Sequence, residues 1–138
     1  MTHEEALHLI CCAEEARKKA YAPYSNCRVG AALLARSGKI YCGCNIENAS
    51  YSPTICAERC AFAKAVSEGE RAFVAIAVVG GIGETVQEHF PPCGVCRQVM
   101  SEFCDKNFVI LLGGGGLELQ KYLLSELLPA GFEKSHLR

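Results

Sequence analysis

The segment FVAIAVVGGIGETVQEHFPPCGVCRQVMSEF, residues 73–103, contains an apolar run, a glycine-rich loop and a pair of cysteines in that order. Phe73–Val79 is continuously apolar, which is typical of a buried strand. Pro91 and Pro92 come just before a region that predicts a short helix over Gly94–Phe103, because proline favours the start of a helix. A strand, a loop and a helix in succession indicate an α/β fold with the cysteine pair at the opening of the helix.

The flanking segments continue this alternation of helices and strands. His3–Ala20 has apolar residues at helical spacing, with acidic residues early and basic residues, including Arg17, late, so a surface helix is predicted there. The other predicted elements are helices over Cys56–Glu68 and Lys121–Leu128, strands over Val29–Leu34, Ile40–Cys44 and Phe108–Leu112, and an edge strand over Leu117–Gln120. Together they predict one domain over residues 1–138, a three-layer α/β/α sandwich with a mixed five-stranded sheet.

The composition favours a globular protein that acts on a small, uncharged partner. Of the 138 residues 50% are hydrophobic and 21% are charged, and the net charge is −1, so we expect no basic surface for nucleic acid or for an anionic membrane. Glutamates interrupt the apolar residues among the first twenty, and no later apolar run could span a bilayer, so a cytoplasmic protein is predicted. The ten cysteines are then expected to be reduced thiols or metal ligands.

Two cysteine motifs form a candidate metal site. Cys93 and Cys96 form a Cys-x-x-Cys pair, which alone is compatible with structural zinc, with thioredoxin-like redox chemistry and with catalytic zinc. Cys56 lies two residues before Glu58 at the start of another predicted helix, a pairing described for zinc deaminases, here with cysteine in place of histidine. Three ligands and no obvious fourth leave one coordination position for water. We therefore predict a catalytic Zn²⁺ bound by Cys56, Cys93 and Cys96.

Glu58 and Arg59 are the predicted chemical partners of this metal. Glu58 can reach the site and move protons only if Cys56 caps its helix and the metal lies beyond the helix end. An acid that merely interacts with the helix dipole is the alternative. Three thiolates on a divalent ion leave a charge of −1, which Arg59 could offset by hydrogen bonding to the sulfurs; a solvated helix arginine is the alternative.

The other cysteines that lie in apolar patterns are predicted to pack as small hydrophobic residues. They are Cys12, Cys42, Cys44, Cys60 and Cys104. None of the four histidines fits a ligand spacing, and only His89 lies near one of the two motifs.

Six motifs between about Ala20 and Phe132 resemble the small, homotetrameric, zinc-dependent cytidine deaminases. They are Pro23-Tyr24-Ser25, Val29-Gly30-Ala31-Ala32, Gly43-Cys44-Asn45-Ile46-Glu47-Asn48-Ala49, Cys56-Ala57-Glu58-Arg59, Pro92-Cys93-Gly94-Val95-Cys96-Arg97-Gln98 and Leu127-Leu128-Pro129. The resemblance implies hydrolytic deamination of cytidine and deoxycytidine to uridine and deoxyuridine, by a homotetramer whose subunits share active sites.

The resemblance also implies roles for residues outside the metal site. Asn45 and Glu47 correspond to the pair that holds the ribose 3'-hydroxyl, although a strand-end Asn and Glu would otherwise be ordinary turn residues. The backbone amide of Ala57 would help to hold the pyrimidine. Tyr51 would reach the ribose in a neighbouring subunit, and Phe132 would stack on a base across a subunit boundary.

The sequence departs from the family pattern at Cys27, where the family usually has an aromatic residue that forms a wall of the base pocket. A wider pocket follows, so a deaminase of a modified pyrimidine nucleoside or of a nucleoside antibiotic is an alternative function. A structural zinc module and a thiol oxidoreductase that uses Cys93 and Cys96 are alternatives from other classes. The near-neutral charge argues against an enzyme that edits polynucleotides. The run Gly113–Gly116 has no functional interpretation from the sequence.

Overall fold

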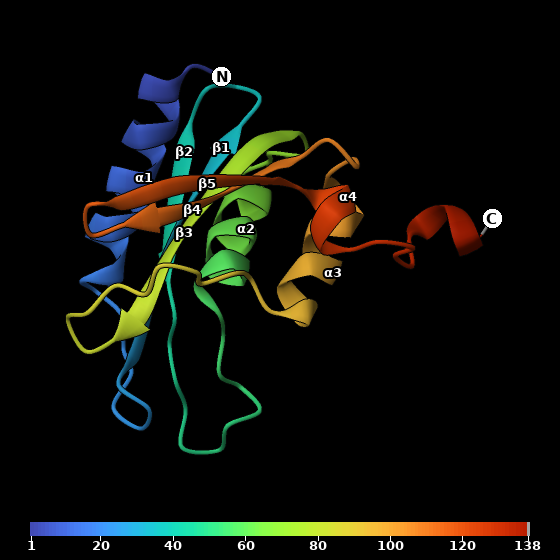
Figure 1. The fold of residues 1–138 in the computed structure, drawn as a ribbon. Helices are drawn as coiled ribbons and strands as arrows, with labels where there is room; N and C mark the ends of the chain where they lie inside the picture. Colours follow the sequence, from blue (N-terminus) through green and yellow to red (C-terminus); the bar gives the residue numbers. More distant parts are fainter. Residues whose placement is uncertain (138) are drawn as a thin grey trace.

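The computed structural model describes residues 1–137 and contains one five-stranded sheet flanked by helices (Figure 1). The main helices are α1 (His3–Arg17), α2 (Ala57–Ser67) and α3 (Gly94–Phe103). The strands are β1 (Cys27–Ala35), β2 (Ile40–Cys44), β3 (Phe73–Ile82), β4 (Val109–Gly114) and β5 (Leu117–Leu123). A short helix α4 (Leu124–Leu127) and a 3₁₀ helix, Lys134–Leu137, follow β5.

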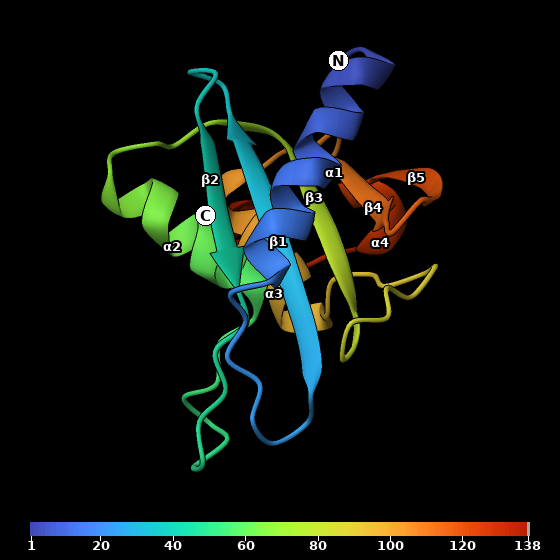
Figure 2. The same ribbon diagram turned by 90° about the vertical axis from the view of Figure 1, so that its left-hand side faces the viewer.

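The sheet separates two hydrophobic clusters, which confirms the predicted three-layer arrangement. Helix α1 covers one face of the sheet, and α2 and α3 cover the other (Figures 1 and 2). On the α2 side Phe62 packs against Phe73, Phe103 and Phe108, with ring centroids 5.1, 6.1 and 6.2 Å away. Burial of large apolar side chains on both faces supplies most of the driving force for such a fold.

The strand order brings the openings of α2 and α3 to one end of the sheet. The order is β2-β1-β3-β4-β5, with β3 and β4 parallel and the other neighbours antiparallel. Gly30 of β1 lies opposite both Cys44 of β2 and Val79 of β3, so β2 and β3 finish at the same end. The segments that precede α2 and α3 both start there.

Gly43 allows α2 to lie directly on β2. A Cβ atom at this position would lie only 2.6 Å from both the carbonyl oxygen of Ala57 and the amide nitrogen of Ala61. The small residue therefore fixes how closely the first turn of α2 approaches the sheet. Further along the same helix, the Lys64 Nζ donates a hydrogen bond of 2.6 Å to the Cys42 carbonyl on the outer edge of β2.

One sequence prediction was wrong, and one residue of α1 is more deeply buried than a surface helix suggests. The helix predicted over Lys121–Leu128 begins only at Leu124, because Lys121 and Tyr122 pair with Leu111 and Ile110 of β4 and so extend β5. Tertiary pairing has overridden a helical pattern. Arg17, at the end of the helix that was predicted to lie on the surface, is only 8% exposed.

The remaining structural predictions concern loops and membrane spans. Gly115 and Gly116, with φ angles of 59° and 79°, form the turn between β4 and β5, where glycine is favoured over residues with a side chain. Within residues 1–137, no helix combines the length and the apolar character that a membrane crossing requires.

Candidate metal centre and active site

Three sulfur atoms converge where α2 and α3 begin. Cys56 and Cys93 are the N-cap residues of these helices, in extended backbone conformation, and neither side chain makes a capping hydrogen bond. Their sulfurs therefore remain available to face each other, 3.8 Å apart. Cys96, in the first turn of α3 and 1% exposed, places its sulfur 3.5 Å from that of Cys93. All three sulfurs lie within 4.8 Å of one another.

The spacing of these sulfurs fits a zinc ion. Tetrahedral ligands at the usual Zn–S distance are about 3.8 Å apart. Within residues 1–137, no other group of three or more His, Cys, Asp or Glu residues has comparable spacing, and no fourth such residue joins this one. Cys60 and His89 lie outside the group, and the His89 Nδ1 instead lies 3.1 Å from the Gln120 Oε1. A third sulfur beside the Cys93–Cys96 pair favours metal binding over dithiol redox chemistry.

Glu58 is buried beside this cluster, in the first turn of α2. Only 4% of its surface is exposed. Burial raises the pKa of Glu58 to about 7, and the neighbouring charge of Cys56 acts in the same direction. A carboxyl group with a pKa near neutrality can both accept and donate a proton, which is the property that a proton carrier needs.

Arg59 lies next to the sulfurs and not in open solvent. Its Nη2 donates a hydrogen bond of 3.4 Å to the Cys56 sulfur. Its Nε is buried and has no hydrogen-bond partner in the part of the chain that the structure describes. The guanidinium therefore places positive charge beside the thiolates and keeps one donor directed into a buried region.

Asn45 and Glu47 lie just beyond the end of β2 and make different contacts. Asn45 is 8% exposed; its Oδ1 accepts from the Val29 amide at 2.8 Å, and its Nδ2 donates to the Cys27 carbonyl at 2.7 Å. One amide hydrogen and one lone pair of Asn45 remain for a further partner. The Glu47 carboxylate accepts hydrogen bonds from the backbone amide and the hydroxyl of Ser25. The bond from the hydroxyl is the main cause of the lowered pKa of Glu47.

A hollow of about 360 Å³ contains two of the predicted substrate residues. Glu47 and Tyr51 line it together with Tyr24, Ser25 and Thr54. Tyr51 is 74% exposed and adopts a φ of 62°. Ser25 and Thr54 were not predicted as site residues, although Ser25 belongs to a motif that the sequence had already singled out.

Ala57 and Cys27 both contact the hydrophobic cluster on the α2 side of the sheet. Ala57 is fully buried at the first position of α2, where a backbone amide has no acceptor within the helix. Cys27, the first residue of β1, is half-buried against the cluster below α2, and its amide donates to the Ser25 hydroxyl at 2.9 Å. Burial raises the pKa of the Cys27 thiol, with a further contribution from Glu47.

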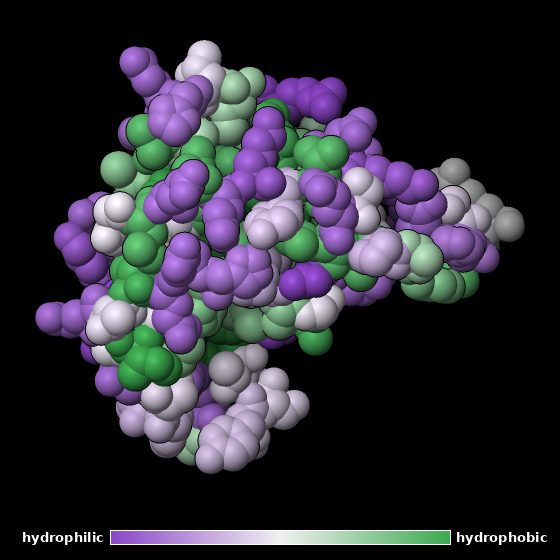
Figure 3. All heavy atoms as spheres, viewed as in Figure 1, coloured by the Kyte–Doolittle hydropathy of each residue, from purple (hydrophilic) through white to green (hydrophobic). Residues whose placement is uncertain are grey.

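Phe132 lies apart from the residues above, on a C-terminal segment that projects from the body (Figure 1). It is 57% exposed and stacks on His136, while the Gln98 side chain donates to its carbonyl oxygen at 2.8 Å. This projection and that of residues 45–55 leave a concave outline between them (Figure 3). The structure therefore does not bring Phe132 to Glu47 and Tyr51 within one chain.

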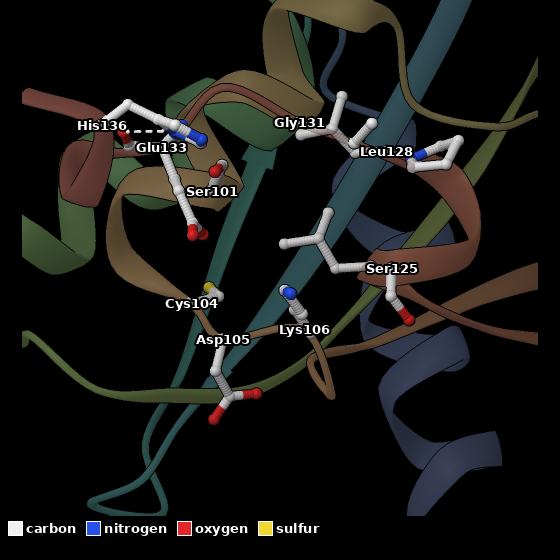
Figure 4. A pocket seen from close by; sticks show the side chains of 12 residues that line it. Ser101, Cys104, Asp105, Lys106, Ser125, Leu128, Gly131, Glu133 and His136 are labelled. Atoms are coloured by element: carbon white, nitrogen blue, oxygen red, sulfur yellow. Dashed lines mark hydrogen bonds between the residues drawn. The ribbon is translucent and has the colours of Figure 1, made fainter.

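A second cavity of about 360 Å³ opens below the C-terminal segment (Figure 4). Cys104, Asp105 and Lys106 line it just after α3, together with Ser125 of α4 and Glu133 of the C-terminal segment. None of the predicted metal, proton-transfer or substrate residues lines this cavity.

Comparison with known proteins agrees with this geometry. Residues 2–112 match the family described as the cytidine and deoxycytidylate deaminase zinc-binding region. The chain belongs to this family. Among curated members of the cytidine deaminases, those of Sporosarcina psychrophila and Halalkalibacterium halodurans are 49% and 52% identical over 129 and 124 residues. These alignments cover 94% and 90% of this chain, and 92% and 91% of the two relatives.

The deaminase fold is confirmed by solved structures. The cytidine deaminase of Burkholderia pseudomallei superposes with a TM-score of 0.85 at 45% identity, covering 96% of this chain and all of the other. A blasticidin-S deaminase of Bacillus cereus is also similar in sequence, with 32% identity over 111 residues and 78% of each chain covered. The relatives therefore include two kinds of deaminase, named for cytidine and for blasticidin S.

Proposed function

We propose that this protein is a zinc-dependent cytidine deaminase, which hydrolyses cytidine and deoxycytidine to uridine and deoxyuridine with release of ammonia. The observation that carries the proposal is the convergence of three cysteine sulfurs, at 3.5 and 3.8 Å, beside a buried carboxyl group. The identity of 49–52% to two cytidine deaminases over nine-tenths of the chain supports the choice of substrate.

Cys56, Cys93 and Cys96 would hold the zinc as thiolates. When bound, zinc with three protein ligands supplies an acidified and oriented water molecule for the reaction. Both helix openings favour the thiolate form, because their partial positive charge and free amides face the sulfurs. The Arg59 guanidinium, 3.4 Å from the Cys56 sulfur, offsets the net negative charge of three thiolates and one divalent ion.

Glu58 would carry protons between water and the base. Its carboxylate accepts a proton from the attacking water and delivers it to N3 of the cytosine ring as oxygen adds to C4. The remaining hydroxyl proton then passes through Glu58 to the departing amine, which leaves as ammonia. Burial that raises the pKa of Glu58 to about 7 suits a group that must be base and acid in turn.

The other predicted residues would hold the nucleoside. The Ala57 amide binds the pyrimidine, and the remaining hydrogen-bonding capacity of Asn45, with the Glu47 carboxylate, binds the ribose 3'-hydroxyl. Tyr51 and Phe132 lie on the two projections of the chain and would act in neighbouring subunits. Their separation within one chain supports active sites that are shared between the subunits of a homotetramer. The proposal further places the protein in the cytoplasm and treats residues 1–138 as one domain.

Deamination of a bulkier cytosine nucleoside is a second candidate function. Cys27 at the start of β1 supports this function, because a thiol occupies less space than an aromatic ring. The similarity to the blasticidin-S deaminase supports it as well. A zinc-loaded sample would be assayed by ultraviolet absorbance on cytidine, deoxycytidine and cytosine nucleosides with larger substituents. Negligible turnover of cytidine beside rapid turnover of a bulkier nucleoside would replace the first proposal by the second.

A chelator separates both enzymes from the remaining alternatives. Removal of zinc should abolish turnover of cytidine, and its return should restore activity. A thiol oxidoreductase would need no stoichiometric zinc, so metal analysis of reduced, purified protein distinguishes it. A structural zinc module would bind zinc but turn over none of the nucleosides.

A further inference from the structure

Arg17, the last residue of α1, places a buried cation among backbone carbonyls. Its Nε donates to the Arg28 carbonyl at 2.9 Å. Its Nη2 donates to three carbonyls beyond or near the end of β3, those of Gly81, Gly83 and Thr85, at 3.0, 2.7 and 3.1 Å. The side chain is 8% exposed, and no carboxylate in residues 1–137 forms an ion pair with it.

This arrangement is unusual for a group that serves stability alone. A buried charge without an opposite charge is expensive to desolvate, and an apolar residue often stabilises such a position as well or better. Unlike an apolar residue, a guanidinium can hold several hydrogen-bond acceptors in fixed positions, because its donors lie in one plane as a fork. Here two of the four acceptors, Gly83 and Thr85, lie at the start of one loop, residues 83–93, which we call the Cys93 loop, and a third, Gly81, lies near the end of β3 just before it.

The Cys93 loop folds back over the end of β3 toward the sulfur cluster. The Gln87 amide donates to the Gly80 carbonyl at 2.8 Å, and the Phe90 ring occupies the space where a Gly80 side chain would be. Val86 packs against the turn between β4 and β5, where a Cβ atom on Gly115 would lie 2.9 Å from its own Cβ. The fold of the loop therefore begins at the carbonyls that Arg17 holds and ends at Cys93.

Of the three sulfur residues, Cys93 depends most on this loop. Cys96 is 1% exposed within α3, and Cys56 is partly buried at the start of α2, whereas Cys93 is exposed where the loop meets α3. We infer that Arg17 is a positioning residue for the metal centre: it holds the Cys93 loop in the conformation that keeps the Cys93 sulfur beside the other two. The inference rests on the proposed role of Cys93 as a zinc ligand.

The test measures zinc retention without substrate. Zinc-loaded wild type and Arg17→Met are mixed with a chromophoric chelator at a temperature at which both are folded by circular dichroism. We expect the variant to release zinc about 10- to 100-fold faster, as for other residues that support a metal ligand. Under partial alkylation, read by mass spectrometry, the ratio of Cys93 to Cys56 labelling should rise severalfold, since only Cys93 lies on the loop.

Two control variants separate positioning from general destabilisation. Leu9→Ala removes a 1%-exposed side chain from the same helix, and Arg71→Met removes an arginine that donates to the Val66 and Glu70 carbonyls in another loop. Both should lower the melting temperature or leave it unchanged while zinc release stays close to wild type. Arg17→Lys, which keeps the charge but not the fork, should release zinc at an intermediate rate.

The outcomes decide the inference in either direction. Zinc release from Arg17→Met within about twofold of wild type, or equal to that of Leu9→Ala, would overturn it. If Arg17→Met does not fold, Val86→Ala loosens the same loop with Arg17 intact, and unchanged zinc release and Cys93 labelling in that variant would overturn the inference equally. A wild type that binds no zinc would instead contradict the proposed function.

Discussion

Two regions of the molecule are rich in cysteine, and they differ in what the thiols can do. The metal-site thiols, Cys56, Cys93 and Cys96, lie within 4.8 Å of one another. The groove thiols line a hollow of about 520 Å³ between α1, β2 and α2 and do not converge in this way. They are Cys11, Cys12, Cys42, Cys44 and Cys60.

The difference comes from backbone position and not from the number of cysteines. Two metal-site thiols are N-caps, so their side chains extend beyond a helix end toward free amides. The groove thiols lie within helices or a strand, where the side chains pack sideways. Hydrogen bonding, chiefly from Cys96 and then from Arg59, lowers the pKa of Cys56, whereas burial raises the pKa of Cys42 and Cys44. Position thus suits one set of thiols to bind a metal ion and the other set to pack against neighbouring side chains.

The largest expected effect is the loss of a metal-site thiol. Cys96→Ala should bind no stoichiometric zinc and lose activity to background, because two thiolates do not complete the site. Cys42→Ala, the matched change in the groove, should keep one zinc per chain and nearly full activity. Metal analysis and the cytidine assay check both. Equal zinc loss in the two variants would break the distinction between the regions.

Replacing the proton carrier should come next in size. Glu58→Gln should keep its zinc and its melting temperature while kcat falls by about 10²–10⁴-fold, the usual contribution of general acid–base catalysis. The groove control is Glu15→Gln, on the solvent-exposed side of α1. An innocuous Glu58→Gln would favour a structural zinc module over an enzyme.

A smaller effect is expected where a cation contacts a thiolate. Arg59→Gln should weaken zinc affinity or activity by about 10- to 100-fold, because the charge of the three thiolates is no longer offset. Lys64 lies on the same helix, but its ammonium group donates to a carbonyl at the groove and not to a metal-site thiol. Lys64→Gln should therefore leave the zinc affinity unchanged. Competition with a chelator of known affinity measures both variants, and parallel losses would argue for a general effect of helix charge.

The smallest effect concerns the pH dependence of groove-thiol alkylation in the zinc-loaded protein. Burial raises the pKa of Cys42 above its ordinary value of 9.0, so less thiolate is present at any given pH than in a free cysteine. Alkylation of Cys42 should therefore still accelerate as the pH rises through 9.0. Peptide mass spectrometry over a pH series gives the profile. A plateau reached below that pH would contradict the assignment of Cys42 to packing.

Local sequence was sufficient for most of the fold, whereas the sulfur cluster was predicted by pairing two motifs as in the zinc deaminases. The apolar run of Phe73–Val79 and the proline pair before Cys93 predicted β3 and α3, because these features act within a few residues. The N-cap position of Cys56 was likewise inferred from its two-residue spacing to Glu58. Contacts over long sequence distances could not be inferred in this way.

Arg17 and β5 show where sequence reasoning failed. A basic residue at the end of a surface helix is expected in solvent, whereas three of the four partners of Arg17 are carbonyls 64–68 residues away, which carry no side-chain signature. The segment Lys121–Leu123 became a strand because β4 was available for pairing. The predicted stacking of Phe132 on a base across a subunit boundary stays a prediction.

The hydrogen bond from Lys64 to the Cys42 carbonyl bears on how the molecule behaves at high concentration. An outermost strand with open carbonyls is a template on which strands of further chains can add edge to edge. Lysine at such an edge opposes that growth. Here the ammonium group occupies an outward-facing acceptor of β2 and places a charge where an incoming strand would have to lie. Acylation of this one amine would remove the charge, and with it this protection of the β2 edge.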